Sequence, residues 1–544
     1  LPVRSGRPRI TASRTFSVDA SEGISPSLDL SELLGIDLAE REHCELRVSA
    51  SPGLELLAAG AYLTDYPHGC AEQTASRIFA ALSTHALRAR TDDSATALAE
   101  VADRVTRGFL RLASMQTEDG GIGYWPGHTS SSPWASLYVA EVVAASTDLG
   151  FKVPGRLRER LAQHVDARLR AARSLDERAR LVHAAAALGS LHAGWMRRLE
   201  EQRGDLTPAG RAALAAALQL AGETPRALAM VEADAADRAG TGTSAVTSAG
   251  RGRYLASSVR TAALELRVLL DADAYHPGVQ RRVDLLMAEK SSASGRWRNT
   301  VDNAAALAAL AKHAQIFRTE EADWRFIARA GSAAAADTTA MDTSSSEEAA
   351  LMVPAGIDVL EAELSGQGAA FITLTATGRS SASSGPLDRG LICRRRLFSR
   401  DGIELDSDAL ARGAIAHGDL VFVEITLATD GRTAVSHVAV VDPFPGGFEV
   451  ETPKLLGQFP WHASLPAKER DATVTPSGSS DRAEFLDDRV LIYGSALPEP
   501  RAYRYAARAV ALGAFEHGPV QAEAMYAPEV SSVGASASRL QITE

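Results

Sequence analysis

The sequence predicts a multidomain protein of helices and strands, in which an α/α toroid of helices lies between two stretches of β structure and an antiparallel β-sandwich follows. Three observations predict this fold class. Residues 53–330 are rich in Ala, Leu and Arg and carry apolar residues at steps of three or four, as packed helices do. The flanking residues alternate polar and apolar side chains in the manner of strands. Residues 386–544 contain short strand-like runs between Gly- and Pro-containing turns.

The two flanking β stretches are each too small to fold alone. Arg14–Val18 and Cys44–Ala50 alternate as strands before the helical region, and Ala369–Ala376 does so after it. So few strands cannot bury a core, and we expect the N-terminal strands to pair with strands far along the chain. Residues 331–350, which include the run Met341–Glu348, are dominated by Ala, Asp, Thr and Ser and are predicted to form a linker or a mobile loop.

The helical region contains a weak internal repeat. In each copy a glycine turn and a tryptophan precede a helix of small residues, so that 115–126 leads into 134–140 and 289–297 leads into 300–310. Small residues let helices approach closely, as the inner ring of a toroid requires. A helix ending near 115–116 is predicted from the apolar stripe Leu98, Val101, Val105, Phe109 and Leu112. Further helices are predicted at about 133–149, 154–170, 175–190, 208–221, 254–270 and 299–314.

The C-terminal stretch is predicted to be a sandwich of short strands. In Leu420–Leu427 the odd-numbered positions are Val, Ile and Leu, while Glu424 and Thr426 fall on the other face. The basic run Arg394–Arg396 at the start of a strand is predicted to be a solvated edge. Further strands are predicted at 489–493, 503–510 and 520–526.

Composition excludes several classes of function. The chain has 544 residues, enough for three or four domains, and a net charge of -11, so it offers no basic surface for nucleic acid. It has no run of about 18 apolar residues that would cross a membrane. Its three cysteines, Cys44, Cys70 and Cys393, are too few and too widely spaced for a disulfide framework or a metal site, and a Cys44–Cys393 bridge is not favoured. The opening Leu1-Pro2 suggests a piece of a longer protein.

The most informative stretch is Tyr66-Pro-His-Gly-Cys-Ala-Glu-Gln-Thr74, at the start of a helical run. Cys70 and Gln73 are three positions apart and can face each other across one helical turn. Attack of the Cys70 thiol on the Gln73 carboxamide, with loss of ammonia, would close an internal thioester. Such a bond is a stored acylating agent, because an amine or hydroxyl that reaches its carbonyl displaces the sulfur. Tyr66 and Pro67 would set a rigid approach, and Gly69 would let the backbone turn tightly.

This run resembles the thioester motif of the alpha-2-macroglobulin and complement family, and its spelling is closest to the bacterial alpha-2-macroglobulins. The stretch 119–125 resembles the loop that follows the thioester helix in that family, and 442–451 and 523–528 resemble its last macroglobulin-like domain. The resemblance implies a Cys70–Gln73 thioester cross-link with the following supporting residues: Tyr66, Pro67, Gly69 and Glu72.

The resemblance also implies a domain plan. Residues 53–330 would form an α/α-toroid thioester domain inserted in a small CUB-like β domain, whose halves are 1–52 and 331–385. Residues 386–544 would form a terminal macroglobulin-like β-sandwich of the receptor-binding type.

The implied function is a broad-spectrum protease inhibitor that works once, as a trap, and is not an enzyme. In the family, a target protease cuts a bait segment, the molecule changes shape, and the exposed thioester acylates a lysine of the protease. Implied partners are therefore proteases, and at lower priority a periplasmic peptidoglycan synthase. The implied location is the periplasm or cell envelope, with membrane attachment only through an upstream lipid anchor. No cofactor, metal or nucleic acid is implied.

Some complement proteins use a histidine near the thioester to direct it towards hydroxyls. No segment here matches the loop that carries this histidine, and His68, His128 and His183 are predicted to be structural or solvated. We therefore predict direct attack by amines.

Two other classes of function stay open at this stage. Residues 116–121 and the tryptophan that follows are similar to repeats of terpene cyclases, which are α/α-toroid enzymes. Such an enzyme would need an acidic proton donor or a metal-binding carboxylate cluster facing the toroid cavity, and the sequence shows neither. The third class is a non-reactive adhesive or structural module, in which Cys70 is a buried thiol that never reacts.

Overall fold

The fold was analysed in a computed structural model of the chain, in which two compact units are seen. One is formed mainly by residues 11–36 and 41–377, and the other mainly by residues 378–544. Within the described ranges, no helix combines the length and the apolar character needed to cross a membrane. The structure describes residues 9–25, 27–30, 40–50, 54–65, 69–88, 95–240, 257–291, 296–317, 322–330, 339–345, 349–379, 386–431, 433–451, 482–535 and 539–544.

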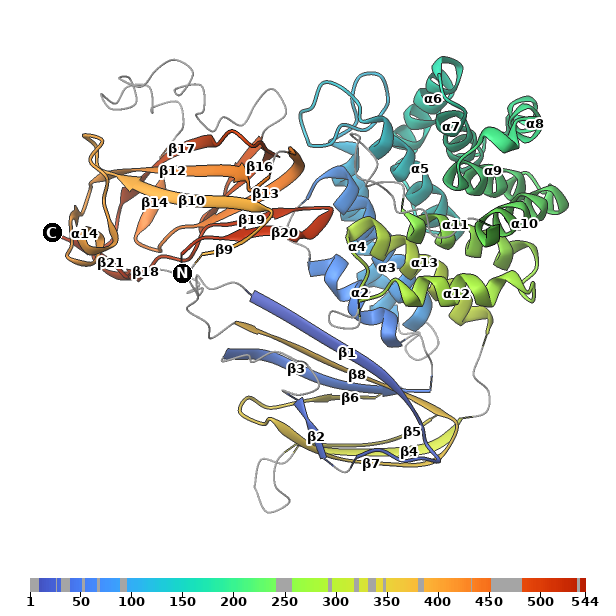
Figure 1. Cartoon of the computed structure of the whole chain (residues 1–544), viewed down its shortest axis with the longest axis horizontal. Coiled ribbons are helices and arrows are strands. Elements are labelled where there is room, and N and C mark those ends of the chain that lie inside the picture. The colour runs from blue at the N-terminus through green and yellow to red at the C-terminus, as the bar shows by residue number, and fades with distance from the viewer. Residues whose placement is uncertain are drawn as a thin grey trace. The chain divides into compact units, whose positions relative to one another are not determined.

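Helices of the first unit form a closed ring (Figure 1). Among the described residues, alternate helices contact one another in the order α3, α5, α7, α9, α11, α13 and back to α3. These ring helices are α3 (Ala71–Arg88), α5 (Pro133–Asp148), α7 (Leu175–Ala187), α9 (Pro208–Leu220), α11 (Ser258–Ala272) and α13 (Thr300–Ile316). Packed against them are α2 (Leu54–Asp65), α4 (Ala95–Ala113), α6 (Gly155–Ala171), α8 (Ala193–Glu201), α10 (Thr224–Gly240) and α12 (Gly278–Ala288), with the short 3₁₀ helix η1 (Arg203–Asp205) after α8.

Local sequence explains where these helices begin. The side chains of Ser132, Ser174 and Thr207 each accept a hydrogen bond from a backbone N–H in the first turn of the following helix. The ring positions are rich in alanine, and most alanines of α9 and α13 are buried, so neighbouring helices approach closely. The predicted helices are observed to within a few residues, but Leu98 at the start of the predicted apolar stripe is 47% exposed.

Strands from both sides of the helical region pair with each other, as predicted. One sheet has the order β1-β8-β3-β6 and the other β2-β7-β4-β5, and the two lie as layers in Figure 1. The strands before the helices are β1 (Arg9–Asp19), β2 (Ser27–Asp29) and β3 (Glu40–Ser49). Those after the helices are β4 (Asp323–Ala330), β5 (Thr339–Ser344), β6 (Ala349–Met352), β7 (Val359–Gln367) and β8 (Ala369–Arg379).

The predicted linker at 331–350 is wrong where the structure describes it. Residues 339–344 form β5, which pairs antiparallel with β4, and 349–352 form β6. Met341 and Thr343 are buried on one face of β5, while Asp342 on the other face bonds to Arg325 at 2.8 Å. Alternate burial therefore outweighs the loop-like composition. Residues 331–338 and 346–348 of the prediction lie outside the described residues.

The second unit is built from mostly antiparallel sheets, in the orders β10-β12-β17-β14, β15-β16-β13-β19-β20-β9 and β11-β21-β18. One apolar cluster, with Val423, Ile492 and Tyr505 among its members, joins these sheets. The elements are β9 (Leu387–Arg389), β10 (Leu391–Phe398), α14 (Ser407–Ala411), β11 (Ile415–Ala416), β12 (Leu420–Thr429), β13 (Val435–Pro443), β14 (Phe448–Val450), β15 (Arg482–Phe485), β16 (Arg489–Ala496), β17 (Arg501–Ala509), β18 (Gly513–Glu516), β19 (Gln521–Ala524), β20 (Ala527–Val533) and β21 (Arg539–Thr543).

One prediction for the sandwich is corrected. Arg395 does not form a solvated edge, because its guanidinium bonds to fully buried Asp442 at 2.6 Å. Glu424, on the other face of β12 from Val423, is also buried and accepts a hydrogen bond from Arg504 Nε at 2.7 Å. Strand β12 is covered on both faces, so its polar positions pair with arginines on neighbouring strands.

Candidate functional site

The predicted reactive pair lies at the first turn of α3. Cys70 is the residue before the helix, and its carbonyl accepts the first helical hydrogen bond, from the Thr74 N–H, at 2.9 Å. The Gln73 side chain folds back, so that its Oε1 accepts a hydrogen bond from the Cys70 N–H at 3.2 Å. This is the reciprocal half of a capping box, in which the third helical residue satisfies the backbone before the helix. Helix capping thus brings the carboxamide to the residue that carries the thiol.

The Cys70 sulfur is enclosed by protein. Cys70 is fully buried and Gln73 is 1% exposed. Burial, and next the nearby Glu72 carboxylate, raise the pKa of the Cys70 thiol well above its ordinary value. Hydrogen bonds to the sulfur from the N–H groups of Gln73 and Glu72 and from the Tyr124 hydroxyl act in the opposite direction. The thiol is therefore neutral at physiological pH, but donors already surround the sulfur where negative charge would develop.

Glu72 points into the helical ring. Its Oε1 accepts hydrogen bonds from Ser76 at 2.7 Å and from Thr300, at the start of α13, at 2.8 Å. Ser76 also bonds to the Tyr138 hydroxyl of α5 at 3.0 Å. Glu72 Oε2 is buried with no hydrogen-bond partner among the described residues. Burial raises the pKa of Glu72 to about 7, in spite of the two hydroxyl donors. This carboxyl group therefore titrates near neutral pH.

Gly69 makes a contact that the sequence did not indicate. Its carbonyl accepts two hydrogen bonds from the Arg111 guanidinium, at 2.9 and 2.7 Å. A Cβ at this position would lie 2.6 Å from Arg111 Nη2. A side chain at this position would therefore displace the arginine that α4 sends across the chain just before Cys70. The predicted supporting residues Tyr66 and Pro67, and His68, lie outside the described residues.

The loop after α4 holds Tyr124 beside the reactive pair. The Tyr124 carbonyl accepts a hydrogen bond from the N–H of Ala71, the first residue of α3, at 3.0 Å. The Tyr124 ring packs edge to face against that of Trp125, with centroids 6.0 Å apart. Trp125 is buried and Tyr124 is half-buried. Tyr124 thus reaches the sulfur by its side chain and the helix start by its backbone.

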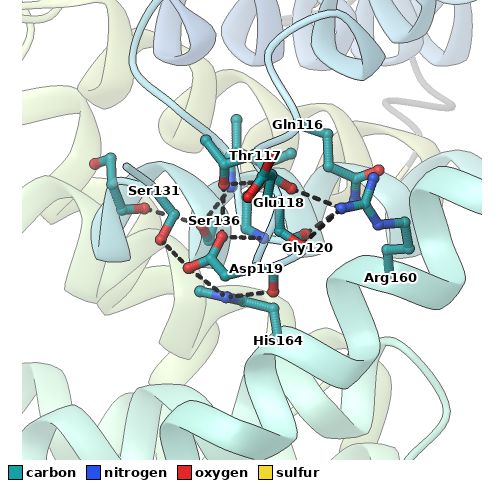
Figure 2. A network of polar contacts seen from close by, with 12 residues as sticks. Gln116, Thr117, Glu118, Asp119, Gly120, Ser131, Ser136, Arg160 and His164 are labelled. Carbon is teal, nitrogen blue, oxygen red and sulfur yellow. Dashed lines mark hydrogen bonds and ion pairs between the residues drawn. The ribbon is translucent and has the colours of Figure 1, made fainter. Parts of the chain in front are cut away.

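A polar network fixes the base of this loop, as Figure 2 shows. Asp119 accepts hydrogen bonds from Thr117 at 2.6 Å, from Ser131 at 2.7 Å and from the Gly121 N–H at 3.1 Å. Its carboxylate also lies 3.3 Å from the ring of His164 on α6. Burial acts to raise the pKa of Asp119, but these partners together hold it below its ordinary value. The loop is therefore anchored by an ionised carboxylate.

Gly120 allows the same loop to lie against α6. It has a φ of +82°, and a Cβ there would lie 2.4 Å from the Arg160 carbonyl oxygen. The Arg160 guanidinium donates to the carbonyls of Thr117 and Glu118, at 2.8 and 2.9 Å (Figure 2). The Arg160 side chain therefore joins α6 to the backbone of the loop, which supports the position of Tyr124.

The remaining predicted residues lie elsewhere. His128 is exposed, and His183 is buried on ring helix α7, where burial lowers its pKa. Cys44 and Cys393 are buried and free of disulfides, as is Cys70. In the described part of the chain, no group of three or more His, Cys, Asp or Glu side chains is arranged to hold a metal ion. The structure thus brings together Cys70, Gln73, Glu72 and Gly69, while the covalent cross-link itself stays a prediction.

Three contributors to the site were not predicted from the sequence: Tyr124, Tyr138 and Thr300. Tyr124 offered a local signal, because it directly precedes Trp125 and Pro126 of the repeat. The fold of the ring brings Tyr138 to Ser76, 62 residues away, and Thr300 to Glu72, 228 residues away. No spacing in the sequence indicates such pairs.

Comparison with known proteins gives a consistent result. Residues 390–529 match the family model described as the bacterial alpha-2-macroglobulin MG10 domain. The chain is 26% identical to the alpha-2-macroglobulin of Escherichia coli K12 over 522 residues, which is 90% of this chain and 29% of that protein. It is 30% identical to the alpha-2-macroglobulin of Xylella fastidiosa Temecula1 over 157 residues, which is 28% of this chain and 9% of that protein. The chain thus spans less than a third of the length of these relatives.

Solved structures show the same fold. Salmonella alpha-2-macroglobulin reacted with methylamine matches 99% of this chain and 34% of its own, with a TM-score of 0.77 and 22% identity. Native Escherichia coli alpha-2-macroglobulin, from domain MG7 to its C-terminus, matches 99% of this chain and 83% of its own, with a TM-score of 0.75 and 20% identity. The family model over residues 390–529 and the curated relatives agree that this chain is similar to the bacterial alpha-2-macroglobulins, and the solved structures show that it shares their fold.

Proposed function

We propose that Cys70 and Gln73 close an internal thioester and that this bond captures a protease covalently through a lysine amine of the protease. The observation that carries the proposal is the hydrogen bond from the Cys70 N–H to Gln73 Oε1 at 3.2 Å in a fully buried site. The fold inferred with it is an α/α toroid inserted in a small CUB-like β domain. This inference rests on the closed ring of helices and on the sheets that join strands from both sides of it.

The bond-forming step balances without a co-reactant. The Cys70 sulfur attacks the Gln73 carboxamide carbon, the thiol proton passes to the departing nitrogen, and ammonia leaves. In capture, a lysine amine attacks the same carbon, an amide forms, and the Cys70 sulfur leaves and takes up the proton of the amine. The protein is used once, because nothing in this sequence of steps restores the thioester.

Two sets of hydrogen-bond donors in the site favour the capture step. Negative charge develops on the carbonyl oxygen when an amine attacks, and the Cys70 N–H that bonds to Gln73 Oε1 is positioned to stabilise it. Negative charge then develops on the leaving sulfur, towards which the Tyr124 hydroxyl and two backbone N–H groups point. Burial of both side chains protects the bond from water until the site opens.

We propose direct attack by amines, without a histidine intermediate. The groups that bond to the Cys70 sulfur are a tyrosine hydroxyl and backbone N–H groups, and His128 and His183 are at an exposed loop and in the helical ring. The Salmonella relative of this fold was reacted with methylamine, which is a small amine. Incorporation of methylamine should exceed that of glycerol at equal concentration, and dominant uptake of glycerol would show that a hydroxyl-directing group operates.

Mass spectrometry tests the thioester itself. In gently purified protein, the peptide that carries Cys70 and Gln73 should be lighter than its sequence by one ammonia, and Cys70 should not react with a thiol reagent. Methylamine should then add to Gln73 and release the Cys70 thiol in equal amounts. The matched control is Cys70→Ala, which should show the full sequence mass and no uptake of methylamine. A wild-type peptide of full mass, with a thiol that reacts once the protein is unfolded, would favour the non-reactive adhesive module.

A further inference from the structure

The helical ring encloses a cavity that the thioester chemistry does not use. Its volume is about 70 Å³, and every ring helix contributes to its lining. Alanines of α9 and α13 leave the space open, because they have no side chain to fill it. Polar and charged side chains come from the other helices, and they are Tyr138, Glu141, Arg180, His183, Arg260 and Arg267.

The charges around this cavity do not balance. Three guanidinium groups, of Arg180, Arg260 and Arg267, face a single carboxylate, that of Glu141. Arg260 is the partner of Glu141, at 3.4 Å, and its guanidinium carbon also lies 5.4 Å from the centre of the Tyr138 ring. The charges of Arg260 and Glu141 therefore cancel. The other two arginines, Arg180 and Arg267, leave an excess of two positive charges.

The two remaining arginines have donors to spare. Within the described part of the chain, Arg267 has neither a hydrogen-bond nor an ion-pair partner, and Arg180 uses only Nε, which donates to the Asp176 carbonyl of its own helix at 3.2 Å. Both side chains are half-buried, so they have lost part of their hydration. His183 between them is 8% exposed and burial lowers its pKa, which leaves it a neutral donor or acceptor.

Like charges in a partly enclosed space are unfavourable unless an anion joins them. Guanidinium groups suit oxyanions in particular, because their planar N–H donors bond to two oxygens at once. A metal or a carbocation is disfavoured here by the same positive charge, which also argues against the toroid enzymes considered from the sequence.

We propose that the ring cavity is a binding site for a small, doubly charged oxyanion such as inorganic phosphate, held by Arg180 and Arg267 with His183 as a hydrogen-bonding neighbour. The site is independent of the thioester and would operate whether or not Cys70 and Gln73 react.

Calorimetric titration of the whole chain with sodium phosphate tests the proposal. Protein purified without phosphate or sulfate is titrated at pH 7.5, with sodium chloride keeping the ionic strength constant. We expect saturable binding at one site, and weaker binding of acetate, which carries a single charge. Absence of saturable phosphate binding to the folded wild-type chain would overturn the proposal.

Variants locate the site. Arg267→Gln should weaken phosphate binding by roughly tenfold or more, which is the effect expected for a lost charged hydrogen bond. The phosphate affinity of Arg267→Lys should lie between those of the wild type and Arg267→Gln, because lysine keeps the charge but not the paired N–H donors. The matched control is Arg281→Gln, an exposed arginine of α12, which should bind as the wild type does.

Should Arg267→Gln fail to fold, as judged by its circular dichroism, Arg180→Gln carries the same expectation. Equal phosphate affinity in the cavity variant and in Arg281→Gln would place any binding elsewhere and contradict the proposal.

Discussion

Replacement of Glu72 by glutamine tests the electrostatics of the site directly. Glu72 is fully buried, and its pKa is raised from an ordinary 4.5 to about 7. Between these two pH values the folded chain keeps a proton that the unfolded chain has released. The free energy of unfolding therefore falls as the pH rises through this window and becomes level above pH 7. A tenfold change in proton affinity is worth about 1.4 kcal/mol. The titration of Glu72 alone should therefore lower the free energy of unfolding by about 2.5 kcal/mol between pH 5 and pH 8.

Glutamine at position 72 does not titrate, so the free energy of unfolding of Glu72→Gln should lose this part of its pH dependence. Its amide oxygen can still accept from Ser76 and Thr300, so the hydroxyl contacts persist. Urea unfolding at pH 5 and pH 8, followed by the helical signal in circular dichroism, measures the difference between the variants. Glu100→Gln, an exposed position on α4, is the matched control and should follow the wild type. Equal pH dependence in Glu72→Gln and the wild type would refute the argument that this carboxyl is held in a desolvated site.

Three further predictions concern the surroundings of the reactive pair. Tyr124→Phe removes the hydroxyl that points towards the sulfur, and should slow the attack of methylamine by roughly 10- to 100-fold in protein with a verified thioester. The rate is measured by release of the Cys70 thiol, and Tyr275→Phe, at an exposed position, should leave it unchanged. Gly69→Ala displaces the guanidinium that bonds to its carbonyl and should lower the free energy of unfolding by about 1–3 kcal/mol, whereas Gly155→Ala, at an open position, should not lower it. Asp119→Asn should reduce thermal stability at pH 7, and the difference from the wild type should shrink as the pH falls through the lowered pKa of this carboxyl, because the carboxyl stabilises the fold only when it is ionised; a difference that stays the same down to full protonation would contradict this.

The reactive pair could be predicted from the sequence because its geometry is local. Cys70 and Gln73 are joined by one helical turn, and the interaction between them is a helix cap, which depends only on residue types and spacing. The helices themselves follow from apolar periodicity in the same way. The contact between Gly69 and Arg111, 42 residues away, cannot be predicted in this way.

Long-range pairing explains the other errors. Residues 339–344 have the composition of a loop but form strand β5, because they pair with the edge of β4 and one face of the strand is buried. Arg395 looks like a surface residue in the sequence, but Asp442 on another strand provides the opposite charge that pairs with it. In both errors, pairing with a distant strand buries residues that the local sequence places at the surface.

The environment of Glu72 depends on the whole ring, not on the motif alone. Thr300, at the start of the last ring helix, bonds to Glu72 in the first, and α13 packs along α3. Removal of α13 would leave one face of α3 open to water. The Glu72 carboxyl would then regain its hydration and its ordinary pKa, and the adjoining turn that carries Cys70 and Gln73 would lose part of its protection. A thioester needs a dry site to persist, so we infer that ring closure must precede a stable cross-link.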